Sequence, residues 1–170
     1  MIRWKGRIGM EELIFRHMET VRGLTLRELD AVPEGTVDRV PAGFRNSIRW
    51  NFGHIAFVQE RLVYEVMGED SGLPDTFREY FAAGTSPAGW TGAPPSMQEI
   101  RAALAAQPGR IRESRMTGPD EPLPRPFTNK MGVTLRTSGE TLLFSLYHEG
   151  LHLETIKRIA RLAEGWRQNG

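Results

Sequence analysis

The chain has 170 residues, the size of one ordinary domain, and we expect a single domain over residues 1–170. Its 22 basic and 21 acidic side chains nearly cancel and no apolar run reaches signal-peptide or membrane-spanning length, so we expect a cytoplasmic protein whose partners include neither nucleic acid nor membrane. The absence of cysteine excludes disulfides, thiolate metal ligands and a thiol nucleophile supplied by the chain, so any metal must bind to histidine or carboxylate side chains.

Two helices are predicted in the first part of the chain. Over residues 10–31 the apolar side chains recur at the spacing of one helix face, and residues 33–35 (PEG) interrupt this pattern. After a short connector, Asn46 or Ser47 can cap a second amphipathic run that ends near Gly68.

A long connection and a third helix follow. Residues 69–95 are rich in glycine and proline but also contain four aromatic side chains, which predicts an ordered loop that folds over the helices. Ser96 and Glu99 have the spacing of a capping box and predict the start of a third helix. Pro108 should kink or break this helix, because proline lacks a backbone N–H and its ring clashes with the preceding turn.

The last part of the chain predicts a second long connection and a fourth helix. Residues 117–138 are rich in proline, glycine and threonine and are expected to include a short strand pair. Thr137 and Glu140 repeat the capping-box spacing, and the helix that follows to Ala163 is apolar over so broad an arc that a second copy of the protein is expected to cover part of it. The predicted fold is all-α: an antiparallel four-helix bundle with long crossover loops.

Three of the four histidines lie in the centres of two predicted core helices. His148 and His152 are spaced i, i+4, so both rings lie on one helix face and can bind one ion. His54 lies among apolar residues of the second helix, where an unpaired imidazole would be costly to bury. We therefore predict that these three residues bind one divalent transition metal and leave positions open for water or substrate. Taken singly, each could be a hydrogen-bonded core residue. We interpret His17 as a residue at the edge of the core with one hydrogen bond.

Residues 148–152 (HEGLH) also match the H-E-x-x-H motif of zinc metallopeptidases, in which the glutamate, here Glu149, is the general base. The longer form of that motif needs a further histidine downstream, and none follows His152. The sequence also lacks a convincing sheet that could bind an extended peptide before the motif. A peptidase is therefore the less favoured alternative.

Three segments resemble the DinB/YfiT-like superfamily of four-helix bundles, described as metal-dependent enzymes: residues 50–55 (WNFGHI), 77–87 (FREYFAAGTSP) and 147–156 (YHEGLHLETI). The resemblance covers nearly the whole chain. It implies that His54, His148 and His152 bind zinc or nickel together with one or more waters, and that the protein is a homodimer. Some members of the superfamily are thiol transferases that use bacillithiol, mycothiol or another low-molecular-weight thiol, and one branch isomerises maleylpyruvate.

These observations predict a metal-dependent transferase or hydrolase that acts on a small electrophile. A metal bound by three neutral imidazoles keeps its positive charge, so it can lower the pKa of a bound water toward about 7 or hold a thiol as thiolate. Because the chain has no cysteine, such a thiol would be a low-molecular-weight cofactor. The alternative is a non-catalytic bundle in which the metal only fastens two helices, or which binds a metabolite.

Four further residues are assigned roles near the predicted metal. Asn51 and Glu149 are candidate catalytic groups that handle protons or support a ligand, and Arg61, two turns after His54, is a candidate contact for an anionic cofactor. The alternatives are an exposed side chain for Glu149 and a surface charge for Arg61. Gly150 is expected to leave room beside the metal for a ligand or another backbone. Close packing of a neighbouring helix is the alternative.

Overall fold

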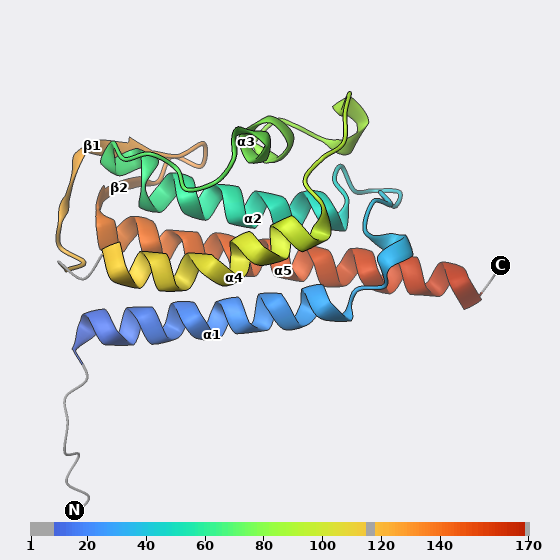
Figure 1. The fold of residues 1–170 in the computed structure, drawn as a ribbon, viewed down its shortest axis with the longest axis horizontal. Helices are drawn as coiled ribbons and strands as arrows, with labels where there is room; N and C mark the ends of the chain where they lie inside the picture. The colour runs from blue at the N-terminus through green and yellow to red at the C-terminus, as the bar shows by residue number, and fades with distance from the viewer. Residues whose placement is uncertain (1–8, 115–117, 169–170) are drawn as a thin grey trace, which may run out of the picture.

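The computed structural model describes residues 9–114 and 118–168 and consists mainly of four long helices that lie side by side (Figure 1). These helices are α1 (Met10–Ala31), α2 (Ile48–Val63), α4 (Met97–Ser114) and α5 (Ser138–Gln168). The expected all-α fold is confirmed. Helices α1 and α5 run in one direction and α2 and α4 in the other, so α1 is antiparallel to its neighbour α4, and α2 to its neighbour α5. The pairs α1/α5 and α2/α4 are parallel.

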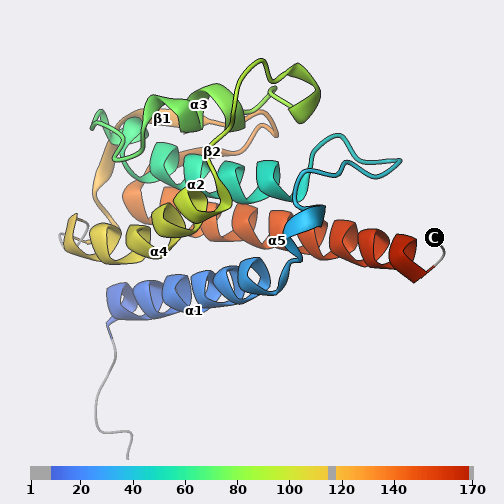
Figure 2. The ribbon, with the colours of Figure 1, turned by 45° about the vertical axis from the view of Figure 1, so that its right-hand side comes forward.

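Two smaller units cover the outer side of α2 (Figure 2). Helix α3 (Asp75–Phe81) lies within the connection between α2 and α4, in a segment for which the sequence predicted only an ordered loop. Strand β1 (Pro122–Thr128) pairs antiparallel with β2 (Thr134–Thr137), so the expected short strand pair is confirmed. None of the described helices is both long and apolar enough to cross a membrane.

The helix starts have the capping bonds that the sequence predicts. Ser47 accepts a backbone N–H from the first turn of α2. The Ser96 N–H donates to the Glu99 carboxylate at 2.7 Å, and the Glu99 N–H donates to Ser96 Oγ at 3.2 Å. Thr137 and Glu140 make the same reciprocal pair at the start of α5. Each cap satisfies N–H groups that have no partner inside the helix.

A buried arginine at the centre of the bundle joins all four long helices. Arg22 of α1 is 2% exposed, and its guanidinium donates twice to the Glu149 carboxylate of α5, at 2.9 and 3.0 Å. It also donates to Gln59 of α2 at 2.6 Å and to Gln107 of α4 at 2.9 Å. Thr25 donates to the same carboxylate at 2.6 Å. A charge can be buried here because it is both paired and fully hydrogen-bonded.

The same arginine allows α4 to continue through Pro108, which lies inside the helix. Proline has no N–H to donate to the carbonyl four residues earlier, which belongs to Leu104. Arg22 donates to that carbonyl at 2.6 Å. Of the predicted kink or break, the break at Pro108 does not occur, because a side chain from α1 satisfies the carbonyl oxygen that the proline leaves free.

Replacing Arg22 by methionine should destabilise the protein strongly. The substitution leaves the Glu149 charge buried without its partner and the Leu104 carbonyl without its side-chain donor. We expect the free energy of unfolding, measured in urea, to fall by about 3–5 kcal/mol. Replacing Glu149 by leucine in the same chain should recover part of this loss, because it removes the unpaired charge.

The matched control is Arg101→Met. Arg101 pairs with Asp30, and both side chains are about half exposed, so we expect little change in stability. A loss for Arg22→Met no larger than for this control would contradict the structural role of the buried pair.

Candidate metal centre

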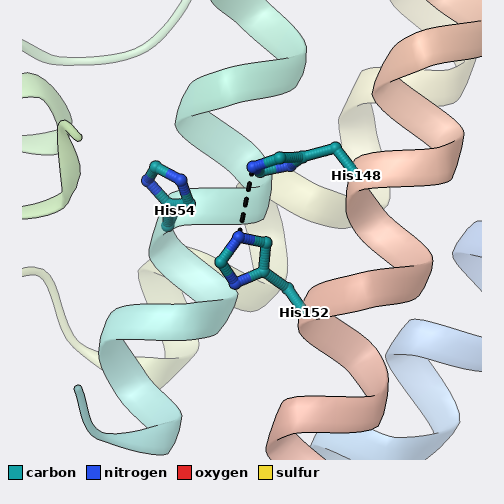
Figure 3. A group of neighbouring side chains, drawn as sticks. All are labelled: His54, His148 and His152. Atoms are coloured by element: carbon teal, nitrogen blue, oxygen red, sulfur yellow. Dashed lines mark hydrogen bonds between the residues drawn. The ribbon is translucent and has the colours of Figure 1, made fainter. Parts of the chain in front are cut away.

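The three predicted ligand histidines meet between α2 and α5 (Figure 3). His54 comes from the middle of α2, and His148 and His152 lie one turn apart on α5. One ring nitrogen from each residue lies within 4.8 Å of those of the other two. The Nε2 atoms of His148 and His152 are 3.1 Å apart. The structure thus brings together three side chains that are up to 98 positions apart in the sequence (54 to 152).

Hydrogen bonds to the Nδ1 atoms orient two of the rings. His54 Nδ1 lies 2.6 Å from the Phe81 carbonyl oxygen, and because a carbonyl only accepts, Nδ1 must hold the hydrogen. Asn51 donates through Nδ2 to the Ser47 carbonyl at 2.7 Å, so its Oδ1 accepts from His152 Nδ1, also at 2.7 Å. In their neutral forms, both rings therefore have a free electron pair on Nε2, the atom available to a metal.

Burial keeps the imidazoles in the form that binds metals. Desolvation, together with the neighbouring imidazoles, lowers the pKa of His148 and of His152 to about 3. Burial also lowers the pKa of His54, although the bond to the Phe81 carbonyl opposes this. The rings are therefore neutral at pH 7, so no positively charged imidazolium has to lose its extra proton before metal binding.

The donor set fits a transition metal. Imidazole nitrogens bind such ions at about 2.0–2.1 Å, so two of them on one ion are at most about 4.2 Å apart. The 3.1 Å separation of His148 and His152 satisfies this limit. Small movements of the rings would bring all three nitrogens, which lie within 4.8 Å of one another, to one ion.

The segment around α3 packs against the histidines and supports them. The Phe81 ring lies against Gly53, where an added Cβ would be 2.5 Å from the ring carbons, so only glycine permits this approach. The approach places the Phe81 carbonyl at His54. The Trp50 ring stacks on His54, with centroids 4.3 Å apart and planes at 17°, and its Nε1 donates to Thr85 at 2.8 Å. The prediction that this segment is an ordered cover over the helices is confirmed.

A cavity of about 240 Å³ opens beside two of the histidines, His54 and His148, and we call it the histidine cavity. Two cationic side chains, Arg61 of α2 and Lys130 of the turn between the strands, also line it. The other walls are mainly apolar and come from α2, the strand pair and α5: Val58, Leu62, Phe127, Met131 and Phe144. A small molecule in this cavity would contact the two histidines directly.

The other predicted site residues divide into two groups. Asn51 contacts His152, one of the predicted ligands. Arg61 is exposed and also lines the histidine cavity, so it is both a surface charge and a side chain at the cavity. Glu149 is 1% exposed and is bound by Arg22 and Thr25 in the core, so the alternative of an exposed side chain was wrong. These contacts favour a structural role and leave the H-E-x-x-H motif without its general base.

Two smaller expectations near the site were also wrong. A Cβ on Gly150 would have no neighbour within 4 Å from another part of the described chain, so the expectation that this glycine lets another backbone or a neighbouring helix pack closely was wrong. His17 is exposed on α1 and does not lie at the edge of the core.

The groups that complete the site were not predicted from the sequence. The Phe81 carbonyl is a backbone atom, so no residue type marks it as a partner of His54. Phe127 and Met131 belong to a hairpin whose sequence gave no indication that it would line a cavity. The aromatic content of residues 77–90 was the one available signal, and it pointed only to a covering segment.

Comparison with known proteins gives one family match. The family model described as the DinB superfamily matches residues 17–156, a range that includes all three histidines. No curated protein matches the sequence.

The metal-free protein should lose stability as the pH falls below 6.5. The ordinary pKa of histidine applies in the unfolded chain, whereas burial lowers the pKa of His54, His148 and His152 in the folded chain. Between pH 6.5 and about 5 the unfolded chain therefore binds more protons than the folded chain. The free energy of unfolding declines by up to about 1.4 kcal/mol per pH unit for each additional proton that the unfolded chain binds. Urea unfolding at several pH values measures this slope.

Two variants test the source of the slope. His148→Gln should reduce it, because one buried imidazole is removed. His17→Gln should leave it unchanged, because that side chain is exposed. Equal slopes in the wild type and in His148→Gln would contradict the assignment.

Proposed function

Since the chain belongs to the DinB superfamily, we propose that it is a metal-dependent enzyme whose metal, zinc or nickel, is bound by His54, His148 and His152. The observation that supports this proposal most directly is the gathering of three neutral imidazoles, two of which have Nδ1 committed to a hydrogen bond and therefore carry their electron pair on Nε2.

We infer a transferase or hydrolase that acts on a small electrophile. A divalent ion held by three neutral imidazoles would act as a Lewis acid toward an oxygen or sulfur ligand. The apolar walls of the histidine cavity, including Val58, Phe127 and Phe144, would hold the substrate next to the histidines and exclude water from it. Asn51 would hold His152 in one tautomer and one orientation, and so acts as a positioning residue.

A sulfur nucleophile, if the reaction uses one, would come from a low-molecular-weight thiol. The chain has no cysteine that could provide it. Arg61 at the wall of the histidine cavity is the side chain we propose as a contact for such a cofactor, because it stays charged and lies beside the histidines.

We also propose that the active form is a homodimer of single-domain chains in the cytoplasm. On α5, Leu143, Tyr147 and Leu151 are about half exposed and recur every four residues, so they form an apolar stripe on one face of the helix. A second copy of the chain would bury this stripe. A monomeric mass by analytical ultracentrifugation would exclude the dimer.

Protein purified without a chelating column should contain about one zinc or nickel per chain by elemental analysis of all first-row metals. His54→Ala and His152→Ala should lose it, because each removes one of three ligands. Asn51→Ala keeps all three ligands but frees the ring of His152, so its metal affinity should fall about 10–100-fold.

The controls are His17→Ala, which removes an exposed histidine, and Asn46→Ala, which removes an asparagine that lies just before the start of α2. Both should retain the metal. Hydrolysis of small esters and conjugation of small thiols should then be assayed with and without the metal. No metal in the wild type, even after reconstitution, would refute the proposed function.

A further inference from the structure

A second hollow adjoins the histidine cavity on the side of β1. It has a volume of about 310 Å³, and we call it the arginine hollow because three arginines line it: Arg61, Arg78 and Arg125. Arg61 and Phe127 line both spaces, so the two spaces meet at these residues. No histidine lines the arginine hollow.

The arginine hollow has an excess of positive charge. Its only acidic side chain is Glu65, and Arg78 donates to that carboxylate at 2.5 Å. Arg61 and Arg125 have no carboxylate partner among the residues that the structure describes. The net charge of the whole chain is only +1, so a general excess of basic residues does not account for two unpaired arginines at one hollow.

Arg61 is held in place where the two spaces meet. Its guanidinium carbon lies 5.3 Å from the centroid of the Phe127 ring, a cation–π contact that restricts the side chain. A guanidinium that is already held loses less conformational freedom when a ligand binds. Lys130, which lines the histidine cavity, adds a further positive charge nearby.

We propose that these two spaces bind one small molecule with a carboxylate or phosphate at one end and a metal-binding group at the other. Arg61 and Arg125 would bind the anionic end, because a guanidinium matches the two oxygens of a carboxylate or phosphate in a bidentate contact. The apolar walls beside the histidines would contact the middle of the molecule. The inference rests on the proposed function, because it assumes that the other end reaches a metal at the histidines.

The test compares charged and neutral probes of equal length. ω-Mercaptoalkanoates and the matching ω-mercaptoalkanols are titrated into the metal-loaded protein by calorimetry, and ω-mercaptoalkyl phosphates form the phosphate arm. We expect the anionic thiols of the best length to bind about tenfold more tightly than the neutral ones. Arg61→Gln and Arg125→Gln should abolish the preference. Arg27→Gln, which removes the same charge from the exposed side of α1, should keep it.

A second arm separates this inference from the proposed function. Inorganic phosphate and glutarate are titrated into the metal-free protein at low ionic strength and followed by NMR chemical shifts. Binding that weakens in Arg61→Gln and Arg125→Gln but not in Arg27→Gln supports the anion site even where no thiol binds. Equal affinity for charged and neutral thiols in a protein that binds metal would overturn the inference and leave the proposed function intact. Phosphate and glutarate binding that none of the three variants changes would also overturn it.

Discussion

The arrangement of the four long helices depends on the guanidinium of Arg22. Its five N–H groups all donate to groups on the other three long helices, so a rotation or shift of any one of them breaks at least one buried bond. Apolar side chains tolerate small displacements, whereas a buried charge that loses its partners does not. Because Glu149 directly follows His148, the ion pair with Arg22 also fixes which face α5 presents to α2. The geometry of the histidines is therefore set partly by a contact on a different side of α5.

Neighbouring residues of α5 belong to two different sites. His148 faces His54 on α2, while Glu149 binds Arg22 on α1. Successive residues of a helix point about 100° apart, so one short motif can serve both a ligand site and the core. The same spacing in a metallopeptidase gives the glutamate a role at the metal. Here the spacing of the histidines is the same, while the glutamate is paired with Arg22 in the core.

Sequence patterns predicted the features that depend on spacing within one helix. They failed for features that depend on contacts between residues far apart in the sequence. The capping boxes at Ser96 and Thr137 and the approach of His148 to His152 follow from spacing along one helix. The predicted break at Pro108 does not occur, because Arg22 donates to the carbonyl that the proline leaves free. Arg22 lies 86 positions before Pro108 (22 to 108), so no local pattern could indicate this contact. Helix α3 has only seven residues, too few for an amphipathic period to stand out. The burial of Glu149 could not be predicted, since nothing local indicates which helix will face it.

Part of the support for His54 comes from the peptide backbone. The oxygen that accepts from its Nδ1 belongs to the main chain of residue 81, so substitutions of the Phe81 side chain do not remove this atom. The close approach of that segment requires the absence of a side chain at residue 53. In evolution, the constraint therefore falls on Gly53, a residue with no functional group. Among related sequences, a glycine immediately before the histidine that corresponds to His54 would mark this site better than any polar residue around it.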